Sequence, residues 1–127
     1  MSPTQRTLAE LRRLGYLAAV VEHWNPHARI RQDLFGCIDV LAIGPRVELA
    51  DPYVLVPVRH DGPLTITLAV QATSGSNVAA RIEKLTASPA LPRLIAAGWR
   101  VEVWGWRKMA RSRRWELRRE RVGCHVT

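Results

Sequence analysis

The stretch Asp33-Leu-Phe-Gly-Cys-Ile-Asp39-Val-Leu-Ala-Ile43 decides the fold of this 127-residue chain. Its apolar and β-branched residues predict a buried strand, and Asp39 lies inside that run. A carboxylate in an apolar setting must be hydrogen-bonded, protonated or bound to a cation. Asp39 is therefore the first candidate functional residue. Gly36, just before it, predicts a loop whose backbone can approach another group closely.

A second stretch, Leu68-Ala-Val-Gln71-Ala-Thr73-Ser-Gly-Ser-Asn77, is the natural neighbour of the first. Residues 64–73 alternate between apolar and more polar side chains, which predicts a strand with Gln71 and Thr73 on one face. If this strand lies beside the first, Asp39, Gln71 and Thr73 converge on one point.

Periodicity, caps and chain breakers predict the other elements. Around 101–103, valines alternate with Arg100, Glu102 and Trp104, which predicts a strand. The predicted elements, in order, are a helix over 4–14, a strand over 16–24, the central strand to 43, a surface loop over 44–52, an edge strand over 53–58, a turn over 60–63, a strand over 64–73, helices over 78–86 and 92–97, and strands over 99–106 and 114–119.

The composition indicates one α/β domain over residues 1–127, a mixed sheet flanked by helices. No run of about 18 apolar residues occurs and the first residues lack the apolar segment of a secretory signal, so we expect a cytoplasmic protein without a membrane partner. Cys37 and Cys124 lack metal-ligand spacing and are expected to be reduced thiols. The four histidines are also scattered, which favours surface or structural roles.

The net charge of +8 is concentrated near the end of the chain. Between Arg107 and Arg121, eight basic residues face only Glu116 and Glu120, a net charge of +6. A polyanion suits this density, and arginine forks match phosphate geometry. The alternative is a solvated basic tail over 107–127. Tryptophans 99, 104 and 106 favour core or interface packing over base stacking, although Trp106 beside two basic residues could wedge into a strand junction.

The order helix, three strands, helix, strand, with a lone Asp in one strand and Gln-x-Thr in the next, resembles the PD-(D/E)xK nuclease superfamily. Within it, the chain is most similar to the small Holliday-junction-resolvase-like and phage-type nucleases. The resemblance covers roughly 7–108, and its motif is short and tolerant. It implies the αβββαβ core of that superfamily. One position departs from the family pattern: Thr73 stands where the family has Lys.

The resemblance implies a Mg²⁺ or Mn²⁺ site held by Asp39, the amide oxygen of Gln71 and the backbone carbonyl of Ala72. An amide is neutral, so Glu22 or Asp33 is expected to add a second carboxylate, with Glu22 ranked first. For Glu22, a salt bridge to a nearby arginine is an equally weighted alternative.

The cation that Thr73 cannot supply is expected from the helix after it, from Lys84 or else Arg81, on a different side from the inward-facing Ala79 and Leu85. A solvated surface lysine is the alternative for Lys84. The predicted catalytic set is thus Asp39, Gln71, Thr73, Lys84 and Glu22.

The leading hypothesis is a metal-dependent endonuclease that cleaves branched or duplex DNA as a homodimer, as the resemblance implies. The Trp99–Trp106 region or an edge strand is its expected interface. The alternative is a DNA-binding or assembly module that kept the fold and lost catalysis. The residues predicted to contact DNA are Arg29, Arg31, Ser74, Ser76, Asn77, Arg81, Arg107, Lys108, Arg111, Arg113 and Arg114.

Overall fold

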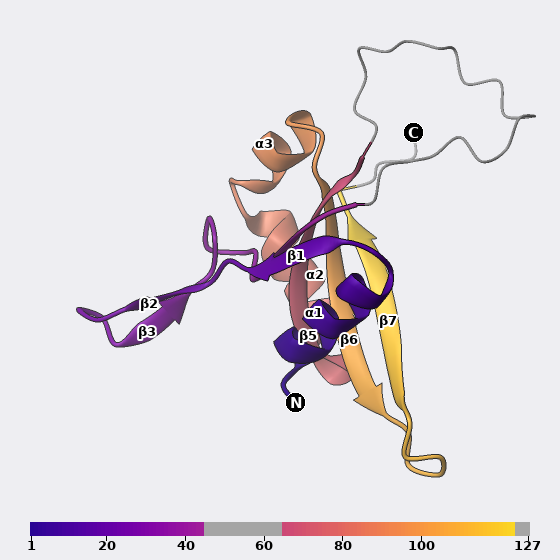
Figure 1. Ribbon diagram of the computed structural model, residues 1–127. Helices are drawn as coiled ribbons and strands as arrows, with labels where there is room; N and C mark the ends of the chain where they lie inside the picture. Colours follow the sequence, from indigo (N-terminus) through magenta and orange to yellow (C-terminus); the bar gives the residue numbers. More distant parts are fainter. Residues whose placement is uncertain (45–64, 124–127) are drawn as a thin grey trace, which may run out of the picture.

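The computed structural model describes residues 1–44 and 65–123, which form a mixed five-stranded sheet flanked by helices, together with a separate two-stranded ribbon (Figure 1). The predicted mixed α/β architecture is therefore confirmed. The expected edge strand over 53–58, the turn over 60–63 and nearly all of the loop over 44–52 lie outside the described residues. The elements are α1 (Pro3–Arg13), β1 (Leu17–Val20), β2 (His23–Asn25), β3 (Ile30–Gln32), β4 (Val40–Ile43), β5 (Thr67–Ser74), a 3-10 turn (Gly75–Asn77), α2 (Val78–Ala87), α3 (Leu91–Ala96), β6 (Arg100–Lys108) and β7 (Trp115–Val122).

The sheet has the strand order β1-β4-β5-β6-β7. β1, β4 and β5 are antiparallel neighbours, whereas β6 is parallel to β5. Parallel neighbours need a crossover connection, and α2 and α3 provide it. β7 then returns antiparallel to β6.

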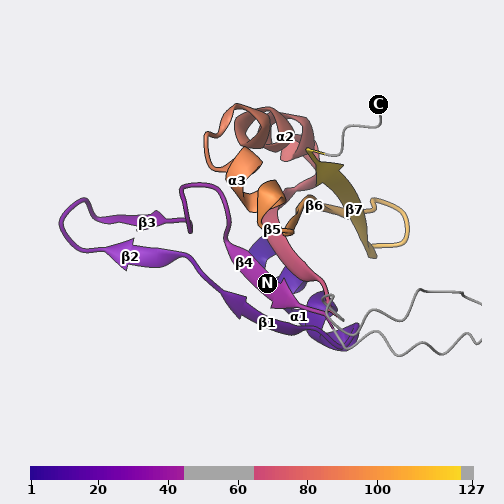
Figure 2. The same cartoon turned by 90° about the horizontal axis from the view of Figure 1, so that it is seen from above.

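Helices cover both faces of the sheet, as Figure 2 shows from above. On one face α1 packs its Leu8 and Leu11 near the fully buried Trp104. On the other face α2 and α3 contribute Val78, Leu85, Leu91 and Leu94, which belong to one core cluster with four buried residues of the strands, Ala69, Val101, Val103 and Val122. Ser2 caps α1, because its Oγ accepts a hydrogen bond from Gln5 N at 3.2 Å.

The loop expected at Gly36 is present, but the central strand begins later than expected. Residues 34–38 form a tight turn in which Phe35 and Gly36 both have positive φ, and β4 begins only at Val40. Asp39 thus precedes the strand instead of lying inside it. The predicted strand over 16–24 is also divided: β1 ends at Val20, and the chain then leaves the sheet to form the β2–β3 ribbon.

One smaller expectation, an inward-facing Ala79, is also wrong. Ala79 is exposed, and α2 faces the core through Val78 and Leu85 instead. The Trp99–Trp106 region packs within the chain: Trp104 is fully buried, and Trp106 Nε1 donates a hydrogen bond to Thr7 Oγ1 at 2.9 Å. The core packing expected for these tryptophans is thus present at Trp104 and Trp106. Across the described residues, none of the helices has the length and apolar character needed to cross a membrane.

Candidate functional site

A polar pocket of about 670 Å³ lies where the ribbon joins the sheet, between the start of β4, the end of β5 and helix α2. Four of its lining residues are the metal ligands predicted from the sequence: Asp39, Gln71, Glu22 and Asp33. Arg81 and Lys84 line it from α2. The pocket thus gathers the acids, the amide and the helix cations that were expected to meet.

Asp39 is held in place by the backbone of β5. Ala72 N donates to both carboxylate oxygens, at 3.0 Å and 3.2 Å. Continuing the register of β4 and β5 would place Ile38 opposite Ala72, but the Ile38 carbonyl instead accepts a hydrogen bond from Leu34 N at 2.8 Å within the turn. The Asp39 side chain therefore takes the place of the missing backbone acceptor.

Burial makes the charge of Asp39 costly. Its side chain is 4% exposed, and desolvation raises its pKa from 3.8 to about 7. The Ala72 N–H lowers the pKa, whereas the negative charges of Asp33 and Glu22 raise it further. Among the described residues, no arginine or lysine forms an ion pair with Asp39. Near pH 7 this carboxyl group is therefore poised between its neutral and its charged form.

Gln71 lies between the two aspartates. Its Nε2 lies 3.3 Å from Asp33 Oδ2 and 3.4 Å from Asp39 Oδ2. Gln71 is 2% exposed, and its Oε1 has no hydrogen-bond partner within the described part of the chain. Asp39 and Gln71 thus share one face of the sheet and one pocket, as the alternation of residues predicted. A buried amide oxygen without a donor is a position that a cation could satisfy.

Glu22 lies at the edge of the pocket and pairs with Arg31, whose Nη1 is 3.2 Å from Glu22 Oε1. The salt bridge considered for Glu22 is therefore present. The ribbon also brings His23 and Gln32 to the pocket, which the sequence did not indicate. This placement was not predicted, because His23 was expected to lie within one strand over 16–24, whereas the chain leaves the main sheet after Val20.

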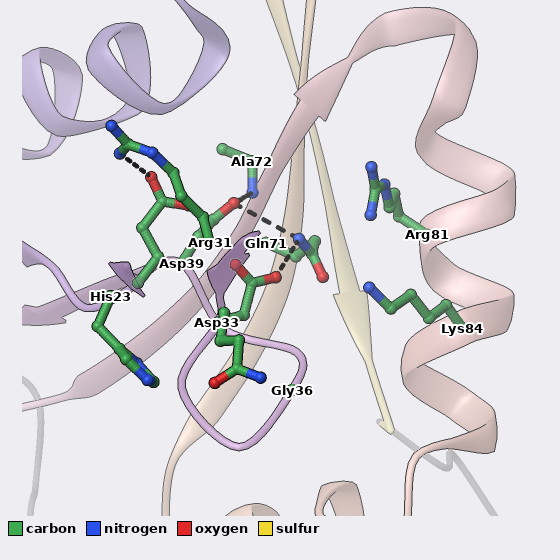
Figure 3. A pocket seen from close by; sticks show the side chains of 11 residues that line it. His23, Arg31, Asp33, Gly36, Asp39, Gln71, Ala72, Arg81 and Lys84 are labelled. Atoms are coloured by element: carbon green, nitrogen blue, oxygen red, sulfur yellow. Dashed lines mark hydrogen bonds and ion pairs between the residues drawn. The ribbon is translucent and has the colours of Figure 1, made fainter. Parts of the chain in front are cut away.

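Lys84 and Arg81 extend from α2 toward Gln71 and Asp33 (Figure 3). Thr73 is buried at 5% exposure and does not line the pocket. Among the predicted catalytic residues, Asp39, Gln71, Lys84 and Glu22 are therefore brought together, and Thr73 is not.

Most of the predicted DNA contacts lie outside the pocket; of the set, only Arg31 and Arg81 line it. Ser74, Ser76 and Asn77 precede α2, Arg29 lies in the turn of the ribbon, Arg107 and Lys108 end β6, and Arg111, Arg113 and Arg114 lie in the β6–β7 turn. In the register of the parallel pair, Ser74 lies opposite Trp106, so the two basic residues after it extend beyond the pocket end of β5.

The donor set suits a hard divalent cation. Over residues 1–44 and 65–123, no three His, Cys, Asp or Glu side chains gather closely enough to hold a metal ion. However, Mg²⁺ accepts amide oxygens and retains several waters, so two carboxylates and one amide can suffice. Asp39, Asp33 and the free Oε1 of Gln71 provide such a set after a turn of the amide group, and this fit rests on the unpartnered Oε1.

Comparison with known proteins adds no assignment: no family model, curated protein or solved structure matches this chain. The functional argument therefore rests on the pocket itself.

Proposed function

We propose that this protein is a metal-dependent endonuclease that hydrolyses phosphodiester bonds in branched or duplex DNA. The observation that carries the proposal is the pocket, in which Asp39, Asp33 and Gln71 face Lys84 and Arg81 across about 670 Å³. Oxygen ligands on one side and fixed positive charges on the other suit a phosphate ester with its counter-ion.

The order and direction of the elements support a nuclease-like core. α1, β1, β4, β5, α2 and β6 follow the αβββαβ order that the resemblance implies, with three antiparallel strands and one parallel strand. In this reading the β2–β3 ribbon is an insertion between the first two core strands, and β7 extends the sheet.

Asp39, Asp33 and Gln71 would hold Mg²⁺ or Mn²⁺, with Glu22 as a further carboxylate. When bound, such an ion polarises the phosphate and lowers the pKa of an attacking water. The water oxygen would bond to phosphorus and give up one proton to solvent, and the bond from phosphorus to the leaving sugar oxygen would break as that oxygen takes a proton from solvent. Asp39 must be ionised to bind the cation, so its pKa of about 7 favours activity above neutral pH.

Lys84 provides positive charge toward the phosphate in place of the lysine that Thr73 replaces. Arg81, one turn earlier on α2, lies beside it and would contact a neighbouring phosphate. The arginines and the lysine of 107–114 lie beyond the end of β5 and would hold more of the DNA backbone, with an affinity that falls steeply with salt. Two symmetric cuts in a junction require two sites, so we propose a two-fold homodimer.

The test is cleavage of a four-way junction and of linear duplex in Mg²⁺, Mn²⁺ or chelator. We expect cleavage only with metal, and none with Asp39→Asn. Lys84→Ala is expected to lower the cleavage rate by about 10²–10³ while DNA still binds, because a charge used in the transition state is lost. Arg93→Ala is the control, since Arg93 is an exposed basic residue on α3 outside the pocket. Metal-independent cleavage, or full activity of Asp39→Asn, would refute the proposed site.

One observation favours a second candidate function. Thr73 is uncharged, buried and not among the residues that line the pocket, so β5 supplies no charge where the family has lysine. A DNA-binding module without catalysis would then bind junctions in a salt-sensitive manner and cleave none of them with either metal.

A further inference from the structure

We propose that the β2–β3 ribbon is a DNA-binding arm on which Trp24 stacks against an exposed base at a branch point. This inference rests on the proposed function, because it concerns the DNA that would enter the same pocket. It assigns a specificity-determining role to Trp24, a residue outside both the metal site and the basic segment.

The ribbon stands apart from the body of the protein. β2 and β3 pair only with each other, as a separate two-stranded sheet, and extend away from the main sheet in both views (Figures 1 and 2). Its turn is preorganised: Asn25 Oδ1 accepts hydrogen bonds from His27 N at 2.9 Å and from Ala28 N at 3.1 Å. Because the ribbon pairs only with itself, its side chains are not covered by the main sheet and are available for a ligand.

Both faces of the ribbon begin at the pocket, which Arg31 lines from one face and His23 and Gln32 line from the other. Trp24 pairs with Arg31 in the register of β2 and β3, so the two side chains share a face. Arg31 in turn bonds to Glu22 at the pocket edge. Trp24 is 57% exposed, an unusual state for so large an apolar side chain. In this proposal a strand of DNA with a phosphate in the pocket passes along the face of Trp24 and Arg31, which offers the aromatic ring and the arginine together.

The charge of the ribbon fits a nucleic acid. Residues 23–32 contain Arg29, Arg31 and two histidines and no acidic residue. A flat aromatic ring beside arginine is the combination that binds single strands and unpaired bases: the ring stacks on a base while the cation contacts phosphate. A protein partner would need a wider apolar patch than Trp24 provides, because Ile30 lies on the opposite face, paired with Asn25.

Stacking also selects the form of DNA. In a continuous duplex each base is covered by its neighbours on both sides, so Trp24 finds no free face. At a branch point a terminal base pair presents one open face. We therefore expect Trp24 to contribute to affinity for junctions and little to affinity for duplex.

The experiment measures binding in chelator, so that it does not depend on cleavage. Fluorescence anisotropy compares a labelled four-way junction with a linear duplex of the same composition. Trp24→Ala is expected to weaken junction binding roughly tenfold, the scale of one lost base stack, and duplex binding by less than about twofold. Trp24→Phe should retain most of the affinity. Ile30→Ala is the matched control, because Ile30 is similarly exposed on the other face of the same ribbon.

A second measurement reports the contact directly. A junction with 2-aminopurine at the branch should change fluorescence when wild-type protein or Ile30→Ala binds, but not when Trp24→Ala binds. Equal losses on junction and duplex, or no loss, would overturn the inference. So would dissociation of a dimer by Trp24→Ala in sedimentation analysis, which would make this face a subunit interface. If junction binding depends on Trp24 but no junction is cleaved with either metal, the endonuclease proposal is refuted and the DNA-binding role of the ribbon is retained.

Discussion

Asp39 and Glu102 are two buried acids on opposite faces of the same sheet, and they differ in whether arginine side chains compensate their charge. Glu102, 2% exposed, accepts hydrogen bonds from Trp104 Nε1 at 3.0 Å and Arg119 Nε at 2.9 Å, and its other oxygen lies 2.7 Å from Arg100 Nε. Asp39, 4% exposed, has only the Ala72 N–H and the Gln71 amide.

The two pKa values follow from these partners. Burial pushes both upward, but Arg119, Trp104 and Arg100 together outweigh it and hold the pKa of Glu102 below its ordinary value. At Asp39 burial prevails, and nearby Asp33 and Glu22 add to it. Glu102 is thus neutralised within the chain, whereas Asp39 is left to be neutralised by a proton or a ligand, the pattern expected of a functional acid.

The largest expected effect comes from Asp39→Asn at alkaline pH. The folded state holds the Asp39 proton more tightly than the unfolded state, so the ionised group removes stability as pH rises from about 4 to about 7. The gap between 3.8 and about 7 corresponds to about 4 kcal/mol. Asn keeps an acceptor for the Ala72 N–H and never ionises. In chelator, urea unfolding at pH 8 should therefore find Asp39→Asn more stable than wild type by up to this amount, and the two proteins should be similar at pH 4. Equal stability at pH 8 would contradict the unpaired state of Asp39.

Glu102→Ala should have the next largest effect, in the opposite direction. It leaves Arg119, Arg100 and the buried Trp104 N–H without their acceptor. The expected loss is about 3 kcal/mol of unfolding free energy, at the lower end for a broken buried pair because both arginines remain partly solvated. The matched control is Glu120→Ala, which breaks the exposed pair with Arg118 and should cost less than about 1 kcal/mol. Similar losses of unfolding free energy in the two variants would show that the contacts of Glu102 with Arg119 and Arg100 do not stabilise the fold.

A divalent metal should stabilise the protein through Asp39, with a smaller effect. A free concentration ten times the dissociation constant contributes about 1.4 kcal/mol. The midpoint temperature of thermal unfolding of the wild type should be higher in Mg²⁺ or Mn²⁺ than in chelator. This increase should be larger at pH 8 than at pH 6, where protons compete with the metal for Asp39. An equal rise in Asp39→Asn would place the metal elsewhere.

Local sequence signals singled out Asp39 and Gln71 but not Glu102. Asp39 and Gln71 could be assigned because a polar residue in an apolar run and a period of two are local signals. Glu102 was not singled out, because its alternation with Val101 and Val103 shows only that it lies on the other face of the strand. It is buried because α1, about ninety residues earlier in the sequence, covers that face. Burial on a sheet face depends on what packs there, and local periodicity does not report it.

The place of Asp33 was predictable only as a candidate. It reaches Gln71 because the chain reverses over residues 34–38, and this turn uses a positive φ at Phe35, a residue type that rarely adopts it. The β2–β3 ribbon was missed for a similar reason. An apolar run from Tyr16 to Trp24 favours one continuous strand, and only the loss of sheet neighbours after Val20 divides it.

The smallest expected effect concerns Glu22, which is intermediate between the two acids. Glu22 has one cationic partner, Arg31, whereas Glu102 has two. The Glu22 side chain is 18% exposed and that of Arg31 is 70% exposed, so their ion pair contributes little to the unfolding free energy. Glu22→Gln should change the unfolding free energy in chelator by less than about 1 kcal/mol. With metal the variant decides a role: if Glu22 joins the metal site, the stabilisation by Mg²⁺ must fall, because a carboxylate ligand becomes a neutral amide. A metal effect unchanged from wild type would leave Glu22 as the partner of Arg31 alone, and would restrict the cation to the carboxylates and amide that meet at Gln71.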